Sequence, residues 1–592
     1  MGEMLRQLSR RYDLTPLRLA LCAGLMLCAA GLSWRLGLGG TAGTLVLFVV
    51  YFQLAWREWA MPSPGHARLW GAVYGALLSA ALTVGRLVRG VTTMRGGPDV
   101  NYIEWEGLKD FAVYLPLAVL LWLAFLQLRR VLRAHALAGP ERKSGRRCFL
   151  LAWGVIFVCW VPYLLAFWPA GLMGDGALTL ESALTPGVPD GNHWVVLYIL
   201  TLRFFVWLAS LFGGSVSVGL CLYAVAQSLA LSATCAVVVW QLWRLGVPGL
   251  AVIAAAVMYA FSGFFASYGM VTWKDTLFSA AVVLLALQLW KIAVQTVLPT
   301  PGQTAAFAGT MLFLCFWRNN GLYLVLPTLV VLAVVLRRRG VRLLAAGLAV
   351  VLLTLGVQGP GYDALGIEKD SLTESVSIPL QQMAATICAD RPLTEEQSDF
   401  LYALIPEKTW KENYSPCLSD DLKTSLDPDL LQENFGQFLT VWAQLLPANL
   451  DVYVEAYLMQ TTGFWMPGSW RGWYYEYYTG VDDVFDRGIR SVDWFAQLTG
   501  HGVQDILESF TRFVSSGTMV WVFLACFFFC LAKPKGRRKA DLLMLTPFLF
   551  SWLTLMISTP IAQSYRYLLM LPLALPLFCV TFVHDRQLSD RA

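Results

Sequence analysis

The sequence predicts an all-α polytopic membrane protein with about fourteen transmembrane helices, one helix along the membrane surface and a mostly helical extracytoplasmic domain. Of its 592 residues, 57% are hydrophobic and 14% are charged, and a soluble protein of this length could not bury so much apolar surface. Runs of about 20 mostly apolar residues, the length that crosses the hydrocarbon core, recur along the chain. Lys and Arg gather in a few dense clusters between these runs.

The apolar runs account for the predicted helices one by one. The first run follows Arg6, Arg10 and Arg11 without a small-residue cleavage site, which predicts a retained helix and not a signal peptide. In chain order, the runs are residues 17–37, 41–60, 70–90, 110–128, 148–168, 215–240, 249–266, 275–293, 304–318, 320–336, 341–360, 516–533, 541–559 and 563–583.

Three basic clusters, at residues 129–147, 337–342 and 533–539, set the predicted orientation. Short loops rich in Lys and Arg stay on the cytoplasmic side. If residues 194–212 crossed the membrane, the number of crossings between the first and second clusters would be odd, and one of these clusters would face outward. All three clusters are cytoplasmic only if residues 194–212 lie along the outer surface. That run contains Arg203 and many aromatic residues, as surface helices do. A spanning helix is the alternative. In the favoured topology both termini are cytoplasmic.

The pattern divides the chain into four segments. Residues 1–147 form an accessory set of N-terminal helices with a basic cytoplasmic linker, and residues 148–360 form a membrane core with polar outer loops. Residues 361–515 are a polar, mostly helical extracytoplasmic segment, long enough to pack a core of its own. Residues 516–592 hold the closing transmembrane helices.

The polar segment carries three notable patterns. "TESVSIPLQQMAATI" predicts an amphipathic helix with Pro379 in its first turn. Residues 449–480 are rich in Tyr and Trp, which suits either a membrane-interface belt or a carbohydrate platform. Cys388 and Cys417 predict a disulfide because the outer compartment is oxidising; two free thiols are the alternative.

Asp175 is the first candidate for chemistry. It lies in "MGDG", just after a predicted helix end and beside glycines that allow close backbone approach. A carboxylate next to apolar walls suits a general base, because desolvation raises its pKa toward the working range. A solvated loop acid is the alternative reading. Asp190, in "PDG", is accounted for by turn chemistry.

Two later outer loops add polar groups at predicted helix starts. Asn192 and His193 open the surface helix, where the histidine would bind a phosphate, orient the base or cap the helix. Lys274 and Asp275 open another helix. Capping explains the aspartate, whereas a lysine in the first turn opposes the helix macrodipole.

Two outward arginines break the expected charge bias. Arg318 lies with Asn319 and Asn320 at a helix hairpin, and Arg566 follows Tyr565 in "YRY". Turn chemistry explains the asparagines. Arginine binds phosphate through two parallel hydrogen bonds, so two outward arginines and a lysine predict an anionic headgroup as ligand.

No nucleotide-binding or metal motif accompanies these groups. The sequence has no Walker lysine loop, no GxGxxG after a strand and no His/Cys cluster with zinc spacing. This argues against ATP as the energy source and predicts a donor that is already activated, such as a lipid-linked phosphate. We expect no nucleic-acid partner.

An outer loop acid, a helix start with a histidine and a later helix opened by an acid resemble the GT-C glycosyltransferases. These include oligosaccharyltransferases, protein O-mannosyltransferases and the aminoarabinose transferase of lipid A. More closely, residues 150–580 resemble an uncharacterised family of large bacterial multi-pass proteins grouped with that superfamily. Relatives commonly have His-His-Pro where this sequence has Asn192–His193–Trp194, which puts any role needing both histidines in doubt. The matching segments are "MGDG…GNHWV", "TWKDTLF", "RNNGLYLVLP", "ESVSIPLQQMA", "YSPCLSDDLK", "VEAYLMQTTGFWMP" and "YRYLLMLPL".

The resemblance implies a GT-C-like fold in a bacterial plasma membrane, with an outward active site. It implies inverting transfer of a hexose or pentose from a polyprenyl-phosphate donor to an envelope glycan, lipid or protein. Asp175 would be the general base, and His193 and Asp275 further catalytic residues. Metal dependence stays open, with Asp175 and Asp275 as the ligands of any Mg²⁺ or Mn²⁺. Donor phosphate would be held by Lys274, Arg318 and Arg566, and substrate by Asn192, Asn319, Asn320, Glu374, Gln381 and Tyr565.

Two other functions compete with this prediction. A transporter or flippase would capture an anionic lipid-linked substrate with the same basic groups, but transporters tend to show internal repeats and charges near the bilayer midplane. The sequence shows neither. A membrane scaffold that presents residues 361–515 leaves the outward Arg and Lys side chains unexplained.

Overall fold

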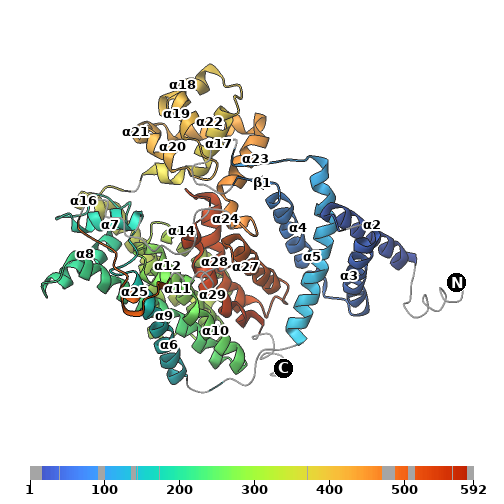
Figure 1. Cartoon of the computed structure of the whole chain (residues 1–592), viewed down its shortest axis with the longest axis horizontal. Coiled ribbons are helices and arrows are strands. Elements are labelled where there is room, and N and C mark those ends of the chain that lie inside the picture. The colour runs from blue at the N-terminus through green and yellow to red at the C-terminus, as the bar shows by residue number, and fades with distance from the viewer. Residues whose placement is uncertain are drawn as a thin grey trace. The chain divides into compact units, whose positions relative to one another are not determined.

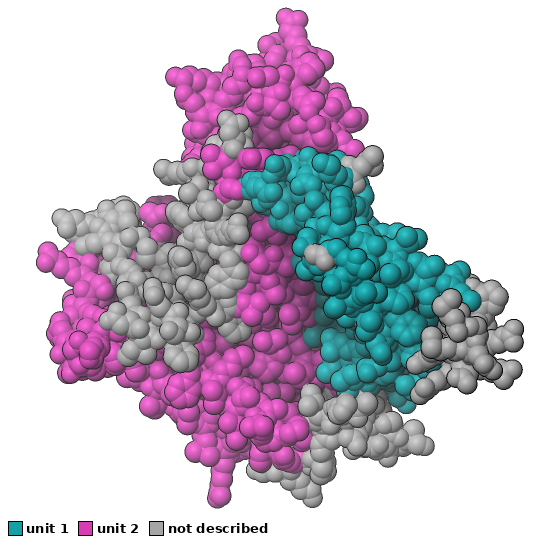
Figure 2. Space-filling model, turned by 45° about the vertical axis from the view of Figure 1, so that its right-hand side comes forward, with its two compact units in different colours: residues 1–89, 103–136, 524–538 teal, residues 90–102, 137–523, 539–592 magenta. Residues whose placement is uncertain are grey.

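The computed structural model is almost entirely helical (Figure 1). It describes residues 16–38, 40–90, 100–134, 142, 145–172, 174–295, 297–369, 371–469, 487–503, 514–562 and 564–582. Among these residues the only sheet pairs β1 (Val88–Arg89) with β2 (Tyr102–Ile103). The chain divides into two compact units (Figure 2), which are residues 1–89, 103–136 and 524–538, and residues 90–102, 137–523 and 539–592.

Unit 1 is a bundle of N-terminal helices joined by the second half of α27 (Ser516–Leu531). Its core includes the buried side chains of Ala29, Tyr51 and Leu123. Helices α4 (Gly65–Gly85) and α5 (Leu108–Ala134) approach closely at Gly75, where a Cβ atom would lie 2.8 Å from the carbonyl oxygen of Ala118. The N-terminal helices are α2 (Pro16–Leu36), α3 (Gly40–Ala60), α4 (Gly65–Gly85) and α5 (Leu108–Ala134).

Unit 2 contains the apolar helices that surround the candidate site. Helix α12 (Lys274–Val294) carries apolar side chains on every face, and most of them are buried. This is expected for a helix at the centre of a bundle. The helices are α6 (Arg146–Ala166), α9 (Val216–Arg244), α10 (Gly249–Phe261), α11 (Gly263–Met270), α12 (Lys274–Val294), α13 (Pro301–Trp317), α14 (Gly321–Leu336), α15 (Val341–Gly356), α28 (Lys539–Ile557) and α29 (Met570–Phe578).

Across the described residues, nine helices are long and apolar enough to cross a membrane, or ten if the bent pair α10 and α11 is one span. The chain is therefore a multi-pass membrane protein. Each of the fourteen predicted runs is helical over most of its described residues, but fourteen crossings are not shown. Helices α13 and α27 are too short to count alone, and the separate helices α14 and α15, which follow one another within residues 321–365, count together as one span.

Helix α8 (Val196–Ser210) is the predicted surface helix, and it follows α7 (Asp175–Leu184). Its 15 residues span roughly 22 Å at 1.5 Å per residue, less than a hydrocarbon core of about 30 Å. Arg203 donates hydrogen bonds to the carbonyl oxygens of Ala183, Thr185 and Gly187 at the end of α7. This length favours a surface location, which stays a prediction.

The polar segment has a hydrophobic core of its own, which includes Leu380, Met383, Leu401, Trp410 and Phe438. Most of its helices gather at the top of Figure 1, whereas α24 (Thr462–Trp465) lies lower, beside α28. They are α17 (Ser377–Cys388), α18 (Glu395–Leu404), α19 (Glu407–Asn413), α20 (Asp420–Ser425), α21 (Pro428–Glu433), α22 (Phe435–Leu445), α23 (Leu450–Gln460) and α24 (Thr462–Trp465).

Helix α17 forms where predicted, with Pro379 in its first turn, but it is not amphipathic. It is buried along nearly its whole length because the other helices of the polar segment surround it. Residues 470–480 of the predicted aromatic stretch lie outside the described residues. The remaining short elements are η1 (Arg337–Gly340), η2 (Val357–Gly361), α16 (Tyr362–Leu365), η3 (Leu372–Ser375), η4 (Leu446–Ala448), α25 (Trp494–Thr499) and η5 (Tyr565–Leu568).

The predicted disulfide is wrong, because Cys388 and Cys417 are both free thiols in the structure. Gln381 of α17 donates a hydrogen bond to the carbonyl oxygen of Ser415, which places the Cys417 turn beside the start of that helix. Cys388 ends the same helix, seven residues later, a rise of about 10 Å that exceeds the reach of a disulfide. Burial raises the pKa of Cys388 to about 11 and that of Cys417 to about 12.

Candidate functional site

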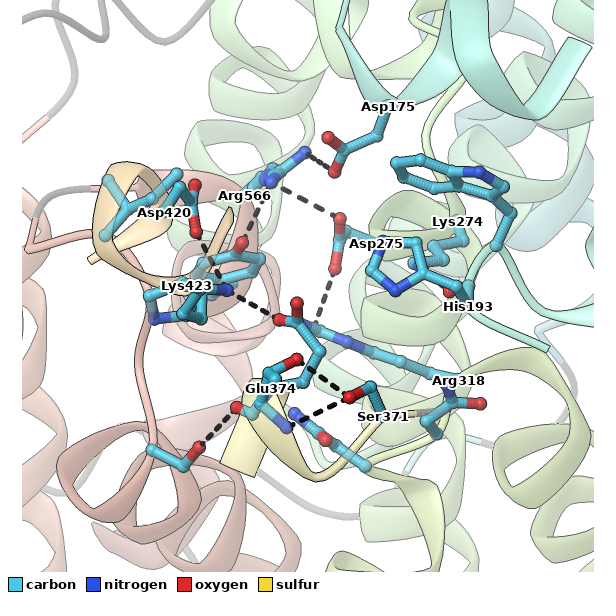
Figure 3. A pocket seen from close by; sticks show the side chains of 18 of the residues that line it. Asp175, His193, Lys274, Asp275, Arg318, Ser371, Glu374, Asp420, Lys423 and Arg566 are labelled. Carbon is cyan, nitrogen blue, oxygen red and sulfur yellow. Dashed lines mark hydrogen bonds and ion pairs between the residues drawn. The ribbon is translucent and has the colours of Figure 1, made fainter. Parts of the chain in front are cut away.

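A cavity of about 660 Å³ in unit 2 collects most of the predicted site residues (Figure 3). The first turns of α7 and α12, the residues between α13 and α14, and η5 supply one part of its lining. The polar segment, the chain just before α8 and the end of α28 with the residues after it supply the rest. The charged lining residues are Asp175, Lys274, Asp275, Arg318, Glu374, Asp420, Lys423 and Arg566, with His193 beside them.

Two glycines explain how "GDG" places Asp175 at the first turn of α7. Gly174 has φ 52°, a conformation that is strained for residues with a Cβ atom. At Gly176 a Cβ atom would lie 2.6 Å from the carbonyl oxygen of Thr272, in the chain entering α12. The backbones of α7 and α12 therefore meet closely enough to bring Asp175 to Lys274 and Asp275.

Arg566 of η5 binds Asp175 directly, with 2.7 Å between Nη1 and Oδ2. The Arg566 side chain is 9% exposed and that of Asp175 is 40% exposed. The guanidinium carbon of Arg566 lies 5.1 Å from the Trp273 ring centre and 4.8 Å from that of Tyr567. These two rings hold the guanidinium in place beside the carboxylate.

This pairing reverses the expected pKa of Asp175. Burial alone would raise that pKa, but the positive charges of Arg566 and then Lys274 hold it below its ordinary value. The predicted net rise of this pKa toward the working range is therefore wrong, although burial does act in that direction. Asp175 is ionised at neutral pH and can accept a proton, but its basicity is suppressed while Arg566 remains bound.

Arg318 pairs with the second aspartate, with 2.7 Å between Nη1 and Asp275 Oδ1. The Asp275 side chain is only 3% exposed, and Arg566 Nε lies 3.9 Å from its other oxygen. The Arg318 guanidinium also faces the rings of Tyr567 and Phe278. Both aspartates proposed as metal ligands are thus bound by guanidinium groups, which does not fit a divalent cation. Within the described residues, no three His, Cys, Asp or Glu side chains group as metal ligands.

Lys274 differs from the other cations that line the cavity. Its ammonium donates to the carbonyl oxygen of His193 at 3.3 Å and lies 5.8 Å from the Trp194 ring centre. Trp317 fixes the start of α12 by donating to the carbonyl oxygen of Lys274. In the part of the chain that the structure describes, Lys274 forms no ion pair, and this leaves its charge available to an anion.

The comparison with known families gives one match. Residues 190–591 match the model of a family of unknown function, DUF6020. The chain belongs to this family. No curated protein and no solved structure matches the chain. The family match includes His193, Lys274, Asp275 and the two arginines of the DUF6020 site, whereas Asp175 precedes it.

Three predicted substrate-binding residues of this DUF6020 chain do not line the cavity. Asn192 is buried; its amide donates to Asn319 Oδ1, and its oxygen accepts from the backbone N–H of Val196. Gln381 is 1% exposed and donates to Ser415 O and Gln460 Oε1 inside the polar segment.

Tyr565, the third of these residues, is 4% exposed and donates its hydroxyl hydrogen to Val514 O. The Asn192 side chain, the Gln381 amide nitrogen and the Tyr565 hydroxyl thus bind other parts of the DUF6020 chain, and none of these residues lines the cavity, which argues against direct substrate binding. His193, Asn319, Asn320 and Glu374 do line the cavity.

Several lining residues of the DUF6020 site were missed by sequence reasoning. Lys423 Nζ lies 2.7 Å from Glu374 Oε2 and 2.8 Å from Asp420 Oδ1. Burial lowers the pKa of Lys423, but the two carboxylates outweigh this and raise it overall. The sequence signal that could have revealed this ion pair was the aspartate three residues before the lysine in "SDDLK". The other missed lining residues include Leu178, Trp194, Ser371, Thr373 and Tyr567.

Proposed function

We propose that this DUF6020 protein is an integral-membrane glycosyltransferase that moves a sugar from a polyprenyl-phosphate donor to an extracytoplasmic acceptor. The single observation that carries the proposal is the cavity of Figure 3, where Asp175 lies among three cations at the ends of apolar helices. Lys274, Arg318 and Arg566 outnumber Asp175 and Asp275 by one charge. This part of the cavity therefore favours an anionic group such as the donor phosphate.

Lys274 is the first residue assigned to the phosphate, because it forms no ion pair within the described chain. A lipid phosphate that reaches Lys274 also approaches Arg318 and Arg566, both of which hydrogen-bond phosphate well. Leu178, Leu555 and Ile561 line the same cavity and offer apolar contacts to the lipid.

In the proposed reaction, the acceptor hydroxyl oxygen attacks the anomeric carbon from the face opposite the phosphate, and the configuration inverts. Asp175 takes the hydroxyl proton. The bond between the anomeric carbon and the phosphate oxygen breaks, and polyprenyl phosphate leaves with the electron pair. Lys274 and the arginines stabilise the charge that develops on this phosphate.

The Arg566–Asp175 pair gives the donor a second role in this scheme. A donor phosphate competes with Asp175 for Arg566, and loss of that partner raises the pKa of Asp175 toward its ordinary value. Donor binding would thereby strengthen the base. Ser371, Thr373 and Glu374 line the cavity from the polar segment, and we assign them to hydrogen bonds with acceptor hydroxyl groups.

The test is a transfer assay in proteoliposomes containing the full-length chain. Undecaprenyl-phosphate-linked hexoses and pentoses serve as donors, a cell-envelope extract supplies acceptors, and mass spectrometry quantifies released undecaprenyl phosphate. We expect Asp175→Asn to lower the rate by at least about 100-fold, the usual contribution of a general base. Binding of undecaprenyl phosphate should persist.

Glu181→Gln is the matched control because Glu181 lies on the same helix and pairs with Arg487 outside the cavity. An Asp175→Asn protein that transfers sugar at the wild-type rate rejects Asp175 as the base. If the vesicles instead move a fluorescent lipid-linked sugar between leaflets without releasing lipid phosphate, the flippase alternative is correct.

A further inference from the structure

A second cavity, of about 470 Å³, lies at the other ends of three helices that reach the candidate site. Helix α12 starts at Lys274 in the first cavity and passes Ala293, which lines the second, just before its end. Helix α14 ends, and α28 begins, at this second cavity. The 21 residues of α12 span about 31 Å, close to the thickness of a hydrocarbon core.

Four cations line this second cavity: Arg337, Arg338, Arg339 and Lys539. No acidic residue is among the described lining residues, and in the described chain none of the four forms an ion pair. Arg339 donates a hydrogen bond to the carbonyl oxygen of Gln295, and its Nε is buried without a partner in the described chain. Four like charges around one cavity repel each other, and an anion in the cavity removes that repulsion.

The backbone at this cavity is strained in a way that groups the arginines. Helix α14 stops at Leu336, and Arg337 then adopts φ 50°, which is uncommon for a residue with a Cβ atom. The 3-10 turn from Arg337 to Gly340 follows. Strained backbone is frequent where a protein clamps a ligand, and here it puts three consecutive arginines in one tight turn.

We propose that this second cavity binds the phosphate of an anionic phospholipid headgroup. Its position, one hydrocarbon thickness from the first cavity, is the level of lipid phosphates. Ala293, Val335 and Leu336 provide apolar walls for the lipid, and arginine suits its phosphate. Basic pockets between membrane helices recognise anionic headgroups on the cytoplasmic side, which is where the charge bias places residues 337–342. The site does not depend on the proposed transferase activity.

The test is native mass spectrometry of the full-length protein released from micelles that contain phosphatidylglycerol or phosphatidylcholine. The pocket variant Arg338→Gln/Lys539→Gln removes two lining charges whose residues are exposed. The matched control, Arg146→Gln/Arg342→Gln, removes two exposed arginines that lie outside the cavity. Thermal unfolding verifies that both variants fold, and Lys539→Gln alone replaces the pocket variant if it does not.

We expect the pocket variant to bind phosphatidylglycerol about tenfold more weakly, since charge-assisted contacts of this kind are lost. The control should stay within about twofold of the wild type, as surface charges away from a site contribute little. Equal loss in both variants, or equal retention of phosphatidylcholine by the wild type, overturns the site. Inorganic phosphate that displaces the lipid completely at millimolar concentration overturns the lipid assignment in favour of a free-anion site. Transferase activity plays no part in any of these readouts.

Discussion

The two ends of helices α12, α14 and α28 are each surrounded by four lining cations but differ in their carboxylates. At the candidate site, the described lining residues include four carboxylates, and three of the four cations form ion pairs with them. At the opposite end, the described lining residues include no carboxylate at all. The two cavities therefore have the same number of lining cations, but most of these cations are paired with carboxylates in the first cavity and, within the described chain, none is in the second.

This difference indicates what each end can do. Where a carboxylate already binds each arginine, an incoming anion must displace it, and the displaced carboxylate changes its basicity. That exchange suits chemistry, because it couples donor binding to Asp175. An unpaired cluster offers attraction without such coupling, which suits a lipid that is held and not transformed. Four variants test this contrast, from the largest expected effect to the smallest.

Asp275→Asn should be the most destabilising of them. It leaves the Arg318 guanidinium, 13% exposed, beside a neutral amide in a nearly buried site. Breaking a buried ion pair by removing one partner costs about 3 kcal/mol or more. Thermal unfolding in detergent measures this loss. Asp363→Asn is the control, since Asp363 pairs with Lys369 while both side chains are more than half exposed, and such a pair contributes less than about 1 kcal/mol. Similar losses in both variants would mean that the Asp275–Arg318 pair is not a buried structural pair.

Lys274→Gln should lower the affinity for the donor phosphate more than it lowers the free energy of unfolding. Lys274 forms no ion pair in the described chain, so its removal leaves no carboxylate without a partner. We expect affinity for undecaprenyl phosphate to fall about 10- to 100-fold, the equivalent of one charged hydrogen bond. Scintillation proximity binding measures this affinity. Lys369→Gln, outside the cavity, should leave it unchanged; an unchanged affinity in Lys274→Gln would remove Lys274 from the phosphate site.

Asp175 should make the thermal stability of the protein fall measurably at acidic pH. Because Arg566 and Lys274 hold its pKa below the ordinary value, the ionised carboxylate stabilises the folded state at neutral pH. This stabilisation is lost as the pH falls below about 4, through the folded-state pKa. Thermal midpoints measured from pH 7 to pH 3 should therefore fall less in Asp175→Asn than in the wild type, with Glu181→Gln following the wild type. Parallel curves for all three proteins would show that the Arg566–Asp175 pair does not form in solution.

Much of the candidate site could be predicted, because its charged residues lie at helix ends and the order of the helices fixes the side on which those ends lie. Counting crossings placed Asp175, Lys274, Arg318 and Arg566 on one side of the apolar helices, and the structure brings these residues into one cavity. The glycines flanking Asp175 also had a local cause, close backbone approach, that the structure shows at Gly176. Helix ends and glycines are local features, which a sequence records directly.

The polar segment was harder to predict, because its packing decides which polar groups reach the cavity. Gln381 looked available in an amphipathic helix, yet α17 is buried on nearly all sides and Gln381 binds the backbone of Ser415. The Asp420–Lys423 pair has a local signal in "SDDLK", but Lys423 lines the cavity because of how α20 packs, which that spacing does not specify. The Asp–Arg partners were equally unpredictable, since Asp175 and Arg566 are 391 positions apart.

Removing the exposed cations of the second cavity should have the smallest effect on the fold. Arg338→Gln/Lys539→Gln breaks no ion pair in the described chain and removes two charges from a repelling cluster. In lipid-free detergent we expect the free energy of unfolding to stay within about 0.5 kcal/mol of the wild type, or to rise slightly. With phosphatidylglycerol present, the wild type alone should gain thermal stability, because a ligand stabilises the state that binds it. If the variant instead unfolds as readily as Asp275→Asn without any lipid, the four cations hold the helix ends together, and the two ends of these helices do not differ in the way their charges are used.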